Sequence, residues 1–477
     1  MWHPFFNYDS GHDLALISAT VTVPAEYRLT TSLPQTETVH GGVRTVHGAS
    51  LHPEFLLSLI YDREWRPVTT MVGSLRFESF LTPAFRFSHD SLARALGRVY
   101  EVLTPRFGEA QLPTHYLAVV EHRGLTGSGF TVRMNNAVVS GDNATRLEET
   151  VLGPSAGFAH EVAHGWTMNA SGPAANMLRE GWATFAEAIV LRAEHGADVE
   201  AAFWDRLRAA YMTGLDRSGR GAGFQGRQSI LGDPDNGRIH YYKGSWILHE
   251  LEDVLGQAAF DRGMRDYIQH TGRGPSGYEE FIAAMSRAAG RGHDMAPFIM
   301  PWLAGKYIPD VDARVDGGQL IVTQDQPGEL FDLLLEVELT AGSSMVRRSV
   351  HLTRRADTVT IAGLGPIREV RVDPDHHFLL VRHWGDTARF ELRAPAAKTA
   401  ELVGNFLAKP MAAARDGDVW SVQLPMTEGR YIWLWRVDGK TPADSVAIAS
   451  AAAGGDAAIA GVRTVRGVRR IVDGYPK

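Results

Sequence analysis

The stretch HEVAHGW, residues 160–166, is the most specific motif of this chain and predicts both a helix and a metal site. His160 and His164 are four residues apart, so in an α-helix both imidazoles lie on one face and can bind the same ion. Glu161 lies beside that face, where its carboxylate can contact a water molecule on the metal. The alternative is a pair of ordinary surface histidines, because a five-residue pattern also arises by chance. Other motifs must therefore separate the two interpretations.

A carboxylate that would complete the site occurs on the next predicted helix, in LREGWATFAE (178–187). A catalytic zinc site needs three protein ligands and an open fourth position. A second helix packed antiparallel to the first would bring Glu180 to the two histidines. Glu180 is therefore the candidate third ligand, and the alternative is a solvated charge on a helix surface.

The string YYKG (241–244) begins a further predicted helix and offers two phenols. A hydroxyl donor aimed at a developing oxyanion stabilises a tetrahedral intermediate. Tyr241 or Tyr242 alone would be interpreted as a packing residue, whereas the whole string followed by an amphipathic helix is more specific. Successive helical residues point about 100° apart, so only one of the two can face a metal.

In order, HEVAHGW, LREGWATFAE and YYKGSWILHELEDVLG (241–256) resemble the gluzincin metallopeptidases, most closely the aminopeptidase N and leukotriene hydrolase family. The resemblance implies one Zn²⁺ per chain, bound by His160, His164 and Glu180. It also implies Glu161 as the general base and Tyr241 as the oxyanion donor, because the family's YxKG motif has its catalytic tyrosine two residues before the lysine. The implied activity is hydrolysis of a peptide or protein substrate by metal-activated water, as an aminopeptidase.

Two departures from the family pattern bear on that activity. The connection between the second histidine and the ligand glutamate, residues 165–179, is shorter than usual, and Arg179 stands where the family has asparagine. The upstream motif whose glutamate binds the substrate's free amine is missing: GSGFT (127–131) has no carboxylate, and Glu121 is the nearest acid. The alternatives are therefore a zinc endopeptidase or other zinc hydrolase that needs no free N-terminus, and a peptidase-like scaffold without catalysis.

The fold class predicted for the whole chain is a multidomain α+β protein in four parts. Residues 1–88 have the alternation of a β domain that is already under way at the first residue, which suggests a truncated start. Residues 89–309 form the mainly helical catalytic domain, thermolysin-like by the resemblance. Its first helix, with Asp90 as candidate cap, has an apolar stripe formed by Leu92, Leu96, Val99 and Leu103. Alternation of period two returns in 310–386, which predicts a β-sandwich, and 387–477 form another strand-rich unit.

The last of these units has a resemblance of its own. AELVGNFLAKPM (400–411) and DGDVWSVQLPMTEGRYIWLWRVDGK (416–440) are similar to the glycogen-binding module of AMP-activated kinase β subunits, which implies an immunoglobulin-like β-sandwich. The two tryptophans with which that family stacks on glucose rings are absent. Trp420, Trp433 and Trp435 fall inside strand patterns, where packing is expected. We therefore expect a structural or docking module, with a carbohydrate-directed protein as the alternative.

Composition limits the partners. Of the 477 residues, 44% are hydrophobic and 22% are charged, as in soluble globular proteins. The net charge of −7 argues against a nucleic-acid partner. The mainly apolar run near the start, residues 14–19, is far shorter than the roughly 20 residues that span a bilayer. The chain has no cysteine, so histidines and carboxylates must hold any metal.

The sequence leaves the cellular compartment of the protein undetermined. Residues 1–13 have neither the basic region nor the apolar region of a signal peptide, so we expect none at this N-terminus. Six of the 48 basic residues are lysine, a bias typical of GC-rich bacterial coding. The chain is thus expected to be bacterial, and either cytoplasmic or exported with its signal removed.

Overall fold

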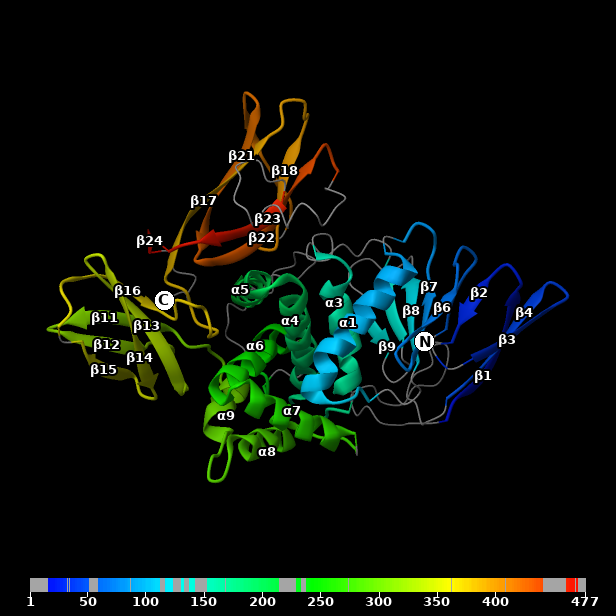
Figure 1. The fold of residues 1–477 in the computed structure, drawn as a ribbon, viewed down its shortest axis with the longest axis horizontal. Coiled ribbons are helices and arrows are strands. Elements are labelled where there is room, and N and C mark those ends of the chain that lie inside the picture. The colour runs from blue at the N-terminus through cyan, green and yellow to red at the C-terminus, as the bar shows by residue number, and fades with distance from the viewer. Residues whose placement is uncertain are drawn as a thin grey trace. The chain divides into compact units, whose positions relative to one another are not determined.

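The structure of the protein is a computed structural model. It describes residues 16–50, 59–111, 116–122, 130–132, 137–141, 152–213, 229–232, 237–440 and 460–470, apart from the single positions 32, 34, 86, 168, 273, 362, 408 and 468. The chain divides into two compact units, residues 1–149 with 153–168 and residues 150–152 with 169–477. Helices and strands occur in both units (Figure 1).

The first unit begins with short antiparallel strands, β1 (Ser18–Pro24), β2 (Arg28–Thr30), β3 (Gln35–His40), β4 (Val43–Ala49) and β5 (Ile60–Asp62). Strand β4 is the centre of a three-stranded sheet of order β1-β4-β3, and β2 pairs with β5. Side chains along β4 alternate between buried and more exposed positions, as expected where one face of a sheet meets a core. This region is strand-rich, as the alternating sequence predicts.

A five-stranded sheet follows, formed by β6 (Val68–Val72), β7 (Leu75–Phe80), β8 (Tyr116–His122), β9 (Phe130–Val132) and β10 (Ala137–Gly141). Its order is β6-β7-β8-β10-β9. Strands β7, β8 and β10 run parallel to one another, whereas β6 and β9 are antiparallel edges. Since β6 and β7 precede residue 88, this sheet crosses the boundary predicted there. The four-domain division remains a prediction.

Helix α1 (His89–Phe107) connects β7 to β8 and carries the predicted apolar stripe. Leu92, Leu96, Val99 and Leu103 are all buried, which confirms the periodicity. The predicted cap is wrong: Ser88 caps the helix, its hydroxyl accepting a hydrogen bond from the Ser91 N–H at 3.2 Å. Asp90 lies inside the first turn, where a negative charge is favourable near the positive end of the helix dipole.

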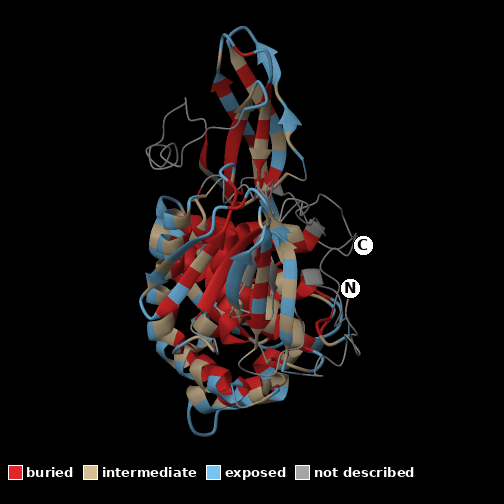
Figure 2. Ribbon diagram, turned by 90° about the vertical axis from the view of Figure 1, so that its right-hand side faces the viewer, coloured by how far each residue is buried: buried red, intermediate tan, exposed pale blue. Residues whose placement is uncertain are grey.

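The remaining helices of the chain follow in sequence. They are α3 (Ser155–Ala163), the 3₁₀-helix η1 (His164–Trp166), the π-helix η2 (Met177–Gly181), α4 (Trp182–His195), α5 (Ala197–Thr213), α6 (Gly237–Leu255), α7 (Gln257–Thr271), α8 (Tyr278–Ala289) and α9 (Ala296–Ala304). Every residue from Trp182 to Leu191 is buried, so α4 is surrounded by protein over most of its length. Figure 2 colours the residues by burial and shows buried residues in the helices and along the strands.

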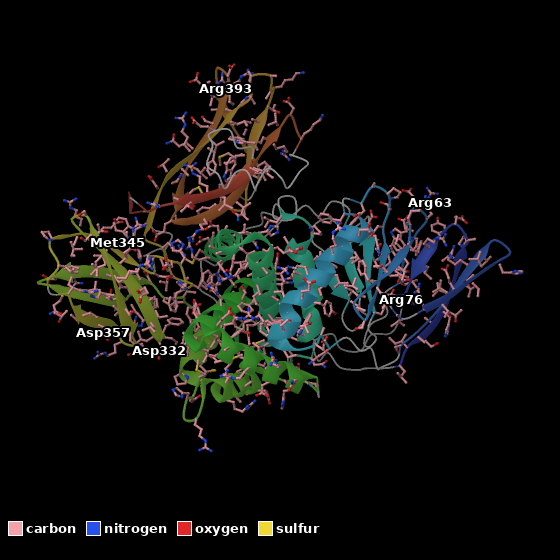
Figure 3. All side chains as sticks on the ribbon, in the orientation of Figure 1. Arg63, Arg76, Asp332, Met345, Asp357 and Arg393 are labelled. Atoms are coloured by element: carbon pink, nitrogen blue, oxygen red, sulfur yellow. The ribbon has the colours of Figure 1, made fainter. Side chains whose placement is uncertain are left out.

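Two β modules complete the second unit. The first contains β11 (Val311–Asp316), β12 (Gln319–Gln324), β13 (Leu333–Ala341), β14 (Ser344–Leu352), β15 (Ala356–Thr360) and β16 (Ile367–Val372). Its two sheets have the orders β11-β12-β15 and β14-β13-β16. Charged side chains such as Asp332 and Asp357 pair at its surface with His351 and Arg354 (Figure 3).

The second module contains β17 (Trp384–Arg393), β18 (Ala400–Gly404), β19 (Met411–Ala412), β20 (Ala414–Asp416), β21 (Val419–Thr427), β22 (Gly429–Val437), β23 (Ala460–Val465) and β24 (Arg469–Arg470). The sheets β20-β21-β17-β24 and β19-β18-β22-β23 enclose one core. Trp420, Trp433 and Trp435 belong to that core, with exposed fractions of 7%, 9% and 0%. Their position agrees with the packing role expected from the strand pattern.

No helix within the described ranges is both long enough and apolar enough to cross a membrane.

Candidate metal centre and active site

The HEVAHGW stretch forms α3 and the short helix η1. Helix α3 has a kink at Ala156 and Gly157, and Gly157 has φ 88°, a conformation that glycine adopts without strain. The α-helix ends at Ala163 and continues as a 3₁₀-helix from His164, so the second histidine begins a tighter turn than the sequence predicts. The imidazoles of His160 and His164 still lie close together, edge to face, with ring centroids 5.0 Å apart.

The end of this stretch is attached to the C-terminus of α1. The Trp166 Nε1–H donates a hydrogen bond to the Gly108 carbonyl at 2.8 Å. The Gln111 N–H donates to the Gly165 carbonyl at 2.7 Å, and the ring of Tyr100 lies 5.5 Å from that of Trp166. These contacts hold the turn that contains His164.

Glu180 lies in the π-helix η2, directly before α4. A π-helix is a rare local widening of the helical turn and frequently occurs at functional sites. The Arg179 guanidinium donates to the Ala170 carbonyl from Nε at 3.1 Å and from Nη2 at 2.7 Å. The Ser171 N–H in turn donates to the Ser276 carbonyl at 2.8 Å. Arg179 thus braces the short connection that precedes Glu180, a role that the sequence did not reveal.

The three ligands predicted from the sequence meet in the structure. His160, His164 and Glu180 each offer one ligand atom, and these atoms all lie within 4.8 Å of one another. His160 is buried, while His164 and Glu180 are partly exposed. Elsewhere in the described ranges, no group of three or more His, Asp or Glu residues meets the same condition. Two imidazole nitrogens and one carboxylate oxygen are a ligand set that suits zinc.

The two tyrosines of YYKG lie near the start of α6 and differ in exposure. Tyr241 is partly exposed, whereas Tyr242 is 8% exposed and belongs to the core. The following residue, Lys243, is fully buried, and its Nζ donates to the Gly305 carbonyl at 2.8 Å, which attaches α6 to the end of α9. The choice of Tyr241 as oxyanion donor stays a prediction, and its greater exposure supports it.

Helix α6 also buries ionisable groups beyond the predicted site. Burial lowers the pKa of Lys243 to about 7, against the attraction of Glu250, which would raise it. Burial also raises the pKa of Glu250 well above its usual value, even though the Leu379 N–H donates to its carboxylate at 2.8 Å. The pKa of His249 is lowered to about 4, mainly by burial against Trp204, whose ring stacks on the imidazole at 4.3 Å. Burial thus favours the neutral form of these three side chains.

The region that would anchor a substrate amine is only partly described. Residues 127–129 lie outside the described ranges, and only the backbone is described for 130–132. The nearest acid in the sequence, Glu121, is buried in β8. Its two carboxylate oxygens accept hydrogen bonds from the N–H and the hydroxyl of Thr82, at 2.5 and 3.1 Å. Glu121 therefore already connects β8 to the segment that follows β7.

Comparison with known proteins gives two similarities. Residues 127–302 match the Peptidase family M1 domain, a range that contains all five predicted site residues. The chain is also similar to "Aminopeptidase N" of Lactococcus lactis subsp. lactis, with 28% identity over 182 residues. That match covers 35% of this chain and 20% of the relative.

Proposed function

We propose that this chain is a zinc-dependent peptidase, and more specifically an aminopeptidase. The observation that carries the proposal is the convergence of His160, His164 and Glu180, whose ligand atoms lie within 4.8 Å of one another. The match of residues 127–302 to the Peptidase family M1 domain supports the peptidase activity. The similarity to an aminopeptidase N supports the narrower assignment.

The donor set fits zinc better than calcium or magnesium. Catalytic zinc sites combine histidines with a carboxylate and leave one position open, whereas calcium and magnesium prefer oxygen ligands alone. His160, His164 and Glu180 would hold the ion. When bound, zinc supplies Lewis acidity, which lowers the pKa of water and polarises a carbonyl group.

Glu161 would act as the general base. It neighbours His160 on α3 and is partly exposed, so its carboxylate is accessible to solvent. A carboxylate there accepts a proton from the attacking water and then gives it to the leaving amine, which requires both protonation states in turn.

Tyr241 would donate its phenol hydrogen to the oxyanion. A donor fixed in place before the reaction stabilises charge that develops only in the transition state. The first turns of α6 are attached to α9 through Lys243 and Gly305, so the backbone that carries Tyr241 is held in place.

The amine preference is tested with two peptides of the same sequence, one with a free N-terminus and one N-acetylated. The zinc-loaded protein should release the first residue of the free peptide and leave the acetylated one intact. Cleavage of both peptides at similar rates would contradict aminopeptidase activity and indicate an endopeptidase. A zinc-loaded protein that cleaves neither would favour a non-catalytic scaffold. The Glu161→Gln variant is the control for contaminating peptidases.

A further inference from the structure

Two glycines lie where the third ligand's helix crosses α6. Gly181 has φ −62° and ψ −42°, ordinary helical values, so its conformation does not require glycine. A Cβ placed on it would lie 2.9 Å from the carbonyl carbon of Gly244 and 2.9 Å from the carbonyl oxygen of His240. A third atom, the Ser245 nitrogen, would lie at 3.1 Å. All three belong to the α6 backbone, which cannot rotate away as a side chain can.

The contact is close from the other side as well. A Cβ on Gly244 would lie 2.9 Å from Cγ of Met177, the residue that begins η2. Helices usually pack with their axes about 8–10 Å apart because side chains separate them. Here Gly181 places no side chain against α6, so its backbone approaches the backbone of Gly244 closely.

Each glycine neighbours a residue of the proposed active site. Gly181 directly follows Glu180, and Gly244 is three residues, about one helical turn, after Tyr241. Both partners are also held from outside, η2 by Arg179 on the Ala170 carbonyl and α6 by Lys243 on the Gly305 carbonyl. These hydrogen bonds anchor the two helices on either side of the crossing.

We propose that the contact between Gly181 and Gly244 is a positioning contact that sets Tyr241 relative to Glu180. It thereby fixes the distance between the zinc ligand and the oxyanion donor. The inference rests on the proposed zinc peptidase function and adds two residues to it that touch neither metal nor substrate. A single methyl group at the crossing would displace both site residues at once.

The test compares Gly181→Ala with Gly263→Ala in the full chain. Gly263 on α7 is the control, a second helical glycine at a close crossing without site residues. Its Cβ would meet side chains, at 2.8 Å from Sδ of Met285 and 3.2 Å from Cβ of Ala288 on α8. Three quantities are measured: the zinc dissociation constant by competition with a chromophoric chelator, kcat and KM on the free peptide, and the unfolding midpoint of the metal-free protein.

Gly181→Ala should weaken zinc binding about 10- to 100-fold, as loss of support for a ligand does. Its kcat should fall by about 10²-fold, the cost of a displacement near 1 Å, and KM should change less. Gly263→Ala should keep the unmodified zinc affinity and kcat, even if its unfolding midpoint falls equally. A folded Gly181→Ala with unmodified zinc affinity and kcat would overturn the inference, as would equal losses in both variants.

If Gly181→Ala does not fold, Gly244→Ala tests the inference instead. The added methyl group of this variant would meet the flexible side chain of Met177, which can move, so the variant is expected to fold. Its kcat should fall, and the double variant Met177→Ala/Gly244→Ala should recover part of the loss, since Cβ of Met177 lies at an acceptable 3.4 Å. Unchanged zinc affinity and kcat in Gly244→Ala would then overturn the inference. If the unmodified protein neither binds zinc nor cleaves either peptide, the proposed function fails, and this inference fails with it.

Discussion

Two groups of polar side chains in this protein are assembled in opposite ways. His160, His164 and Glu180 bring together the lone pairs of two imidazoles and a carboxylate, which is the ligand set of a metal ion. The second group surrounds the buried carboxylate of Asp205, on α5, with groups of positive charge from the protein itself. His376 Nδ1 lies 3.1 Å and Arg382 Nη2 lies 3.2 Å from its Oδ1.

The second group also joins elements of the C-terminal module to the helices. The Arg430 N–H on β22 donates to Asp205 Oδ2 at 2.6 Å. A Cβ on Gly429 would lie 3.1 Å from Asp205 Cγ, so the glycine allows the carboxylate to approach the strand. From this contrast we infer that the gathered lone pairs of two imidazoles and a carboxylate indicate a metal ligand set. A buried carboxylate that is neutralised by the protein's own side chains indicates a structural role.

The largest expected effect is loss of the metal. Glu180→Ala and His160→Ala each remove one of three ligands, so purified protein should lose its single zinc and its hydrolysis should fall to background. Metal analysis by mass spectrometry checks the result, with Glu279→Ala, an exposed carboxylate at the start of α8, as the control. Full zinc occupancy in Glu180→Ala would exclude Glu180 as a ligand.

Glu161→Gln should separate chemistry from metal binding. The amide keeps the size of the carboxylate but cannot accept the proton, so turnover should fall by about 10²- to 10⁴-fold while zinc is retained. Steady-state kinetics together with metal content check this. Turnover near that of the unmodified protein would remove Glu161 from the mechanism.

Asp205→Asn should affect stability and leave the metal site unchanged. Removing one partner of a buried ion pair typically lowers the free energy of unfolding by about 3–5 kcal/mol. Urea unfolding checks the loss, and zinc content should not change. The control is Asp418→Asn, whose exposed carboxylate lies 4.0 Å from Arg393 and should contribute at most about 1 kcal/mol. Similar losses in both variants would contradict the contrast between the two groups.

Tyr241→Phe should lower kcat by about 10²- to 10³-fold, or 2.7–4 kcal/mol of transition-state stabilisation, because it removes only the donor hydroxyl. Zinc content and KM should change little. Tyr242→Phe is the control, since Tyr242 lies in the core and should have a much milder effect on turnover. If the two variants exchange their behaviour, the alignment with the YxKG motif is wrong.

The smallest expected effect is a pH dependence of the Asp205 contribution. Burial alone would raise the pKa of Asp205, but the charges of His376 and Arg382 and the hydrogen bonds to His376 and Arg430 lower it far below the usual range. The stability it contributes is therefore present above the unfolded pKa of about 3.9 and is lost as pH falls through the folded value. The difference in unfolding midpoint between unmodified protein and Asp205→Asn should shrink on acidification from pH 7 to 3. A constant difference would contradict this.

Local sequence patterns predicted the helices and strands of much of the fold. They did not predict which residue caps a helix or which strands pair. The stripe of α1 is buried as its periodicity indicates, but Ser88 caps the helix instead of Asp90. Both residues have suitable side chains, and only the point at which the chain leaves the extended conformation selects one. Similarly, nothing in the local sequence shows that β6 and β7 join the sheet of β8. Strand partners far apart in sequence are chosen by packing.

The candidate site shows the same limit. The short connection before Glu180 looked like a departure from the family, and the structure shows how η2 and the Arg179 bracing accommodate it. A sequence signal for the positioning contact did exist, because Gly181 and Gly244 lie in helices, where glycine is unfavourable by about 1 kcal/mol relative to alanine. That cost suggests that close packing requires glycine at these positions, but the sequence does not show which segment packs there.

Sequence alone was sufficient for the part of the predicted ligand set that is local. His160 and His164 are four residues apart, so a helical backbone brings them to one face whatever surrounds them. The tertiary structure alone decided that Glu180 reaches them and that Tyr242 rather than Tyr241 is in the core. It also decided that Asp205 meets His376, Arg382 and Arg430 from distant segments. The reason is physical, because helical periodicity extends over a few residues, whereas burial and charge pairing depend on which segments pack together.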